Sequence, residues 1–232
     1  MEKISRKEAI ERAGRSGDLS DCDFSGVDLS GLDLIAVDFR ASLFRGASLA
    51  QTNLSASRLD DADLVGCALG SGNFTGASFR GAKLAHVDLT YSTFIGADFS
   101  GADLAGADFT NSNLAAAVFD GANLAGANLQ MTDAARASFA GARMADANLR
   151  AANMTAARLP GADLRRTNLN GTDFGGADLG RADLRGAFIG ETRMSAANLE
   201  EADLRGANFG QANSDRTRTA GARFGPLDAG DP

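Results

Sequence analysis

The chain has 232 residues, with 23 basic and 30 acidic side chains, a net charge of -7, one histidine and two cysteines. This length suffices for one sizeable domain, or at most two. The acidic balance argues against general binding to nucleic acid phosphates, and two cysteines with one histidine leave little for a disulfide framework or a zinc site. No run approaches about 20 apolar residues, and the N-terminus lacks the apolar core of a secretory signal. We therefore expect a cytoplasmic protein without a membrane span, metal or cofactor.

The first 17 residues predict a helical cap. Ser5 and Glu8 have the spacing of a capping box, in which each side chain bonds the other residue's backbone N–H. We expect a short α-helix over residues 6–13, with Gly14 as its end.

A five-residue repeat follows the cap. Every fifth position from Leu19 to Phe209 is Leu, Phe, Met or Ile, except Ala134. The residue two places earlier is small in every pentad but that of Leu32, and the residue directly before the large one is Asp or Asn in 26 of 39 pentads. The register is unbroken over more than 190 residues.

A period of five fits neither common secondary structure. On an α-helix it distributes the large residues around all faces, and on a flat strand it reverses the face at each step. The chain must bend once per pentad to return each large residue to one axis, and Gly, Asp and Asn tolerate such bends. We expect the Asp and Asn side chains to bond the local backbone there.

The phenylalanines suggest how many pentads form one coil. Phe79, Phe99, Phe119 and Phe139 are 20 residues apart, and Phe39 has the same phase. Four pentads per coil would stack these rings in the core. The sequence then supplies nearly ten coils.

The pentads, such as Ala97-Asp98-Phe99-Ser100-Gly101, resemble the pentapeptide repeat family. The resemblance implies an all-β fold, a right-handed quadrilateral β-helix of about ten coils over residues 18–212. Residues 213–232 are expected to hold degenerate repeats and a flexible tail, with no C-terminal helix. Either a second copy covers the last coil, giving a homodimer, or Phe224 caps it.

Some positions depart from the repeat or carry reactive groups. Ala134 is expected to leave a small packing defect, which Ala134→Leu would fill. Cys22 and Cys67 occupy the small inward slot, where packing thiols are expected rather than a disulfide. His86 has an outward phase and is expected to be a solvated surface residue.

The charges are unevenly distributed. Residues 1–120 carry 17 acids and ten bases, whereas residues 121–232 carry 13 of each. Seven candidate partner-binding residues lie in two columns of 20-residue spacing, which form either a docking strip or an ordinary ladder of solvated ion pairs: Asp103, Asp163, Asp183 and Asp203 in one, and Arg165, Arg185 and Arg205 in the other. Asp98 and Asp108 are further candidates for partner binding. A nearly uncharged face, suited to partner packing or to solvent, contains Ile35, Ala36, Ala56, Gly76, Ile95, Gly96, Ala115, Ala116 and Val118.

The resemblance also implies functions. Several pentapeptide repeat proteins, among them Qnr-type and mycobacterial fluoroquinolone-resistance proteins and toxin-immunity relatives, bind DNA gyrase by resembling a DNA duplex. This implies a non-catalytic DNA mimic that binds gyrase and gives fluoroquinolone or toxin protection. The alternative is a scaffold or adaptor for other proteins, without a topoisomerase role. Neither reading involves catalysis, a cofactor or direct nucleic acid binding.

Overall fold

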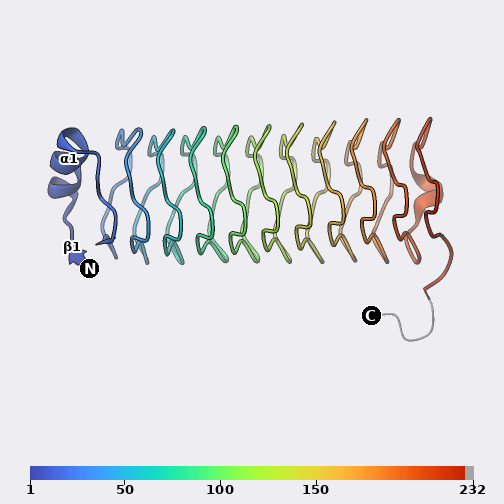
Figure 1. Ribbon diagram of the computed structural model, residues 1–232, viewed down its shortest axis with the longest axis horizontal. Coiled ribbons are helices and arrows are strands. Elements are labelled where there is room, and N and C mark those ends of the chain that lie inside the picture. Colours follow the sequence, from blue (N-terminus) through green and yellow to red (C-terminus); the bar gives the residue numbers. More distant parts are fainter. Residues whose placement is uncertain (228–232) are drawn as a thin grey trace.

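The computed structural model describes residues 1–227. It consists of the strand β1 (Glu2–Lys3), the helix α1 (Arg6–Arg15), the strand β2 (Cys22–Asp23), a long series of pentads and the 3-10 helix η1 (Phe209–Gln211). Figure 1 shows a rod of stacked coils with α1 at one end and η1 near the other.

Each coil contains four pentads, because parallel β-bridges join residues that are 20 apart. The series runs from Asp18↔Asp38 to Asp203↔Arg223. Four sets of aligned pentads result, which we name after their first central residue the Leu19, Phe24, Leu29 and Leu34 stacks. At a strand spacing of about 4.8 Å, each coil adds that length to the rod.

The pentad buries its two inward residues and turns at its corner. Central residues from Leu19 to Leu204 are at most 2 % exposed. At the turn, Ala102 N–H donates to the Phe99 carbonyl over 3.0 Å. Gly101, the corner residue inside this turn, has a φ of +66°. Non-glycine residues such as Tyr91 take the same left-handed conformation at other corners. The hydrogen bonds between coils therefore outweigh the energetic cost of this conformation for a residue with a side chain.

The aromatic core confirms the predicted stacking for four of the five rings. Phe99 lies 4.8 Å from Phe79 and 4.9 Å from Phe119, with nearly parallel planes, and Phe139 continues the series at 4.8 Å from Phe119. Phe39 lies outside this series because Leu59 occupies the coil between. Its ring instead meets Phe24 and Phe44 edge-on.

The cap at the N-terminal end continues the 20-residue register. β1 pairs in parallel with β2, and this places the buried Ile4 above Phe24, while α1 contributes the buried Ala9 to the core. The capping box of Ser5 and Glu8 is present. The expected end of the helix at Gly14 is wrong, because the helix continues to Arg15 and the positive φ belongs to Gly17.

The cap also explains why Leu32 occupies a position that holds a small residue in all other pentads. Leu32 is half-buried because α1, rather than a pentad, lies above it. A groove of about 350 Å³ remains there, lined by Ile10, Leu32, Asp33 and Ile35 among others.

The last coil keeps its backbone pairing despite polar central residues. Asn213, Arg218 and Arg223 still form bridges to the preceding coil, whereas η1 replaces the bridge expected at Asn208. Phe209 and Phe224 contact each other with ring centroids 5.2 Å apart, and Phe224 remains 47 % exposed. The end of the predicted flexible tail, residues 228–232, lies outside the described residues.

Candidate interaction surface

Asp and Asn before each central residue serve the backbone, as predicted. Asp98 Oδ1 accepts the Ser100 N–H at 2.9 Å, and Asp108 Oδ1 accepts the Thr110 N–H at 2.9 Å. Asn123 accepts an N–H in the same way. Because the neutral amide performs this role too, the backbone contact needs the side-chain oxygen but not the charge of an Asp at this slot.

The candidate acids in the first half have few cationic neighbours. Asp103 accepts the Asn123 side-chain amide at 2.8 Å and has no ion pair within residues 1–227. Asp98 does bind one cation, Arg80, at 2.8 Å. Burial raises the pKa of Asp98, but hydrogen bonds from Ser100 and Arg80 outweigh this effect and hold the pKa below its ordinary value.

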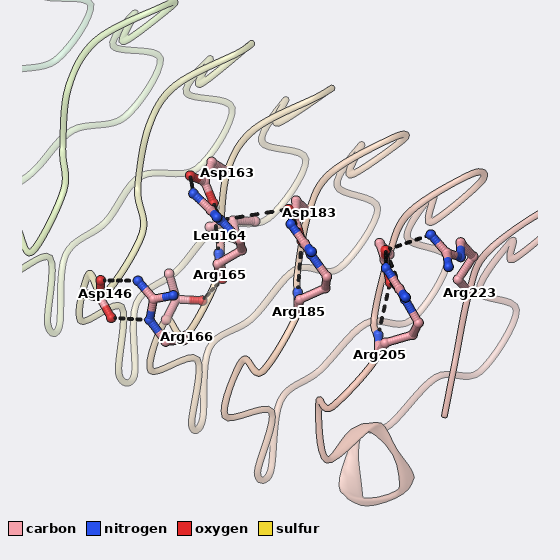
Figure 2. A network of polar contacts seen from close by, with 11 residues as sticks. Asp146, Asp163, Leu164, Arg165, Arg166, Asp183, Arg185, Arg205 and Arg223 are labelled. Carbon is pink, nitrogen blue, oxygen red and sulfur yellow. Dashed lines mark hydrogen bonds and ion pairs between the residues drawn. The ribbon is translucent and has the colours of Figure 1, made fainter. Parts of the chain in front are cut away.

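The candidate charges of the second half form a ladder (Figure 2). Arg165 donates from Nε and Nη2 to the Asp163 carboxylate, both at 2.8 Å. Arg185 and Arg205 repeat this bidentate contact with Asp183 and Asp203 in the next two coils. We name these six residues the Arg–Asp ladder.

The ladder becomes more buried toward the C-terminal end and is linked between coils. The exposed fraction of the arginine side chain falls from 28 % at Arg165 to 9 % at Arg205. Arg223 bonds Asp203 from the following coil at 3.2 Å. The hydrogen bond from Arg205 is the largest cause of the lowered pKa of Asp203, and Arg165 lowers that of Asp163 likewise. The two columns therefore compensate each other's charge, and their role in binding a partner stays a prediction.

Sequence reasoning did not single out four arginines that the structure leaves without ion pairs. Each of the nine arginines between residues 161 and 223 forms an ion pair. In contrast, the preceding four are exposed and have no ion pair or side-chain hydrogen bond within the described part of the chain: Arg136, Arg143, Arg150 and Arg158. The signal in the sequence was Arg143 and Arg158 in the slot that usually holds Asp or Asn.

The uncharged face lies on the Leu34 stack. Four successive coils, at residues 53–56, 73–76, 93–96 and 113–116, present no charged side chain there. Ile95 is 40 % exposed on this surface. Val118 belongs to the neighbouring Leu19 stack, because it bridges Asp98 and Ser138.

The reactive side chains do not converge. Cys22 and Cys67 are free and buried, and burial raises the pKa of Cys67 to about 12. His86 is exposed. Within residues 1–227 no three His, Cys, Asp or Glu side chains cluster in a way that would hold a metal ion. No helix in this range has the length and apolar character needed to cross a bilayer.

Comparison with known families identifies the repeat. A model described as "pentapeptide repeat region" matches residues 17–94, and one described as "pentapeptide repeats (8 copies)" matches four overlapping segments between residues 102 and 213. The chain belongs to the pentapeptide repeat family. Curated protein sequences contain no significant match to it.

Solved structures agree with this assignment. HetL of the cyanobacterium Nostoc sp. strain PCC 7120, a pentapeptide repeat protein involved in heterocyst differentiation regulation, is 26 % identical, with a TM-score of 0.70 over 95 % of this chain and 94 % of HetL. Full-length QnrB1, a plasmid-mediated fluoroquinolone resistance protein, is 19 % identical over 83 % of this chain and 91 % of its own, with a TM-score of 0.38. Rfr23 of Cyanothece 51142 is 30 % identical over 39 % of this chain and 64 % of its own, with a TM-score of 0.34. The fold is a right-handed β-helix.

Proposed function

We propose that this protein is a non-catalytic binding rod with four sides in a quadrilateral cross-section, and that its acidic half binds DNA gyrase in place of duplex DNA. In this proposal the domains are the cap (1–17), the rod (18–212) and the last repeats with the tail (213–232). Partner contacts come from side chains on the rod surface, with Asp98, Asp103 and Asp108 at the centre. The setting is the bacterial cytoplasm, and the effect is protection from a fluoroquinolone or a toxin.

One observation carries the proposal: the net negative charge of the rod lies in its first half. Residues 18–120 hold 14 acids and five bases, whereas residues 161–223 hold nine of each. Five coils span about 25 Å, so the acidic part has about one net charge per 2.7 Å, compared with about 1.7 Å in duplex DNA. Such a rod would be attracted into a basic DNA-binding surface.

The absence of convergent chemistry favours binding over catalysis. Binding sites for substrates are usually concave, with a few polar groups directed at one point. A hollow of about 510 Å³ on the Leu19 stack is lined by Arg40, Arg58, Arg80 and neighbouring residues. These three arginines form ion pairs with Asp38, Asp60 and Asp98, respectively. This arrangement offers no nucleophile paired with a base.

A gyrase supercoiling assay with purified protein tests the proposal, with and without a fluoroquinolone. We expect inhibition, or rescue from the drug, at low micromolar protein, and a weaker effect as salt rises. No effect at tens of micromolar protein in low salt would remove the gyrase proposal.

The second candidate is a regulatory adaptor without a topoisomerase role. The likeness to HetL over almost the full length of both chains favours it, because HetL is described as involved in regulation. The uncharged surface of the Leu34 stack would be the contact face in that case. Retention of a partner by the wild type but not by an Ile95→Lys variant would support the adaptor.

A further inference from the structure

The outer surface of the Phe24 stack carries a column of alternating charge. Parallel bridges connect Lys83, Asp103, Asn123, Arg143 and Asp163 in successive coils. The column therefore reads positive, negative, neutral, positive, negative along the rod, with one coil of about 4.8 Å between neighbours. We name these five residues the charge column.

The charge column is complementary to its own reverse. If a second copy lies antiparallel against this surface with a two-fold axis at Asn123, Asp103 faces Arg143 of the other copy. In the same arrangement Lys83 faces Asp163, and each contact occurs twice by symmetry. Both copies have the same coil spacing, so all four opposite-charge pairs stay in register.

The surroundings of the charge column allow a close approach. The outward residue two places further along the chain is alanine in four successive coils: Ala85, Ala105, Ala125 and Ala145. On the other side the corner residues Gly101, Gly121, Gly141 and Gly161 have open space where a side chain would project. These small residues allow two rods to approach closely along these coils.

Three of the four charges in the column, Lys83, Asp103 and Arg143, form no ion pair within residues 1–227. Lys83 and Arg143 are exposed, and the Asp103 carboxylate accepts the Asn123 amide instead of a cation. The ladder just beyond differs, because Asp163 already binds Arg165. Arg143 thus stands one coil before a region in which every arginine is paired.

We propose that the charge column is the interface of an antiparallel homodimer, formed side by side through the Phe24 stack. The contact is about four coils, or 19 Å, long and one pentad wide, which is small for a stable complex. Association should therefore be weak, in the micromolar range, and should weaken as salt rises. This interface is distinct from the C-terminal coils, but it shares Asp103 with the proposed gyrase surface.

Sedimentation velocity with charge-reversal variants tests the interface. The wild type should self-associate at about 20 mM salt and become monomeric at about 300 mM. Arg143→Glu places a glutamate opposite Asp103, and Asp103→Arg places an arginine opposite Arg143. Each single variant should weaken the dimer at least about tenfold.

Recombining the two changes makes the test specific. An equimolar mixture of the Arg143→Glu and Asp103→Arg variants restores opposite charges at both positions, as does the double variant alone, so both should dimerise again. Arg150→Glu is the matched control, since Arg150 is also exposed and unpaired but lies on the Leu29 stack. It should leave the dimer unchanged. Circular dichroism verifies the fold of each variant.

Other results would overturn the proposal. These are a wild type that stays monomeric at several hundred micromolar in low salt, equal effects of Arg143→Glu and Arg150→Glu, or a folded double variant that fails to dimerise.

Discussion

The first and second halves of the rod share one backbone but differ in core and surface. The first half packs many phenylalanines and carries excess acid, whereas the second has mainly aliphatic central residues and, from residue 161 to 223, pairs its arginines with carboxylates. Asn and Asp each accept the backbone N–H of the residue two places further along, as Asn123 and Asp98 show. The comparison indicates that the repeat leaves the surface charge free to serve another purpose.

Core substitutions in one stack should have the largest effect. Phe99 and Leu179 are both buried in the Leu19 stack, one in each half. Phe99→Ala removes a ring stacked on two others and should lower the free energy of unfolding by about 3–5 kcal/mol, and Leu179→Ala by about 2–4 kcal/mol. Denaturant titration followed by circular dichroism measures both. A loss below about 1 kcal/mol for Phe99→Ala would show that the ring stack is not a main source of stability.

The Arg–Asp ladder should make a smaller, pH-dependent contribution. Because the pKa of Asp203 is lowered in the folded protein, its stabilising effect is present above the unfolded pKa near 4 and is lost as pH falls through the folded pKa. Asp203→Asn keeps the backbone contact and should cost about 1 kcal/mol at pH 7. In denaturation curves at several pH values, the difference from wild type should shrink below about pH 4. A difference independent of pH would contradict the assigned role of the charge.

Filling the missing central side chain should give a modest gain. Ala134 is completely buried where other pentads have a large residue, with Leu114 and Met154 in the neighbouring coils of its stack. Ala134→Leu should raise Tm by about 2–4 °C, as seen by thermal unfolding. A lower Tm would mean that neighbouring side chains already fill the space.

Removing acidic charge from the first half should have the smallest effect on stability. Asp88, Asp103 and Asp108 are followed by backbone N–H groups that their side chains bond, and Asn can accept the same bonds. The triple Asp→Asn variant should therefore unfold within about 0.5 kcal/mol of the wild type. A larger loss in denaturant titration would show that these carboxylates are required by the fold itself.

The sequence was sufficient for the regular part of the fold because each pentad repeats the same burial pattern. It predicted the capping box, the 20-residue coil and the buried thiols. It misplaced the helix end, because Gly14 lies inside the last turn of the helix and the left-handed position that follows the helix is Gly17. It placed Asp163 and Arg165 in adjacent columns, but it could not show that they bind each other rather than a partner. Whether Arg165 binds Asp163 or a partner protein depends on side-chain conformation. The same holds for Arg143, which forms no ion pair within residues 1–227.

The measurement that tests the account most directly compares the wild type with the Asp88, Asp103 and Asp108→Asn triple variant in the gyrase supercoiling assay. If the acidic half acts in place of DNA, the wild type at low micromolar protein concentration inhibits supercoiling or relieves the inhibition of gyrase by the fluoroquinolone. The equally stable triple variant should then require at least about tenfold more protein. Equal potency of the two proteins, or no effect of the wild type at tens of micromolar, would contradict the claim that the unpaired acidic charge serves binding to gyrase.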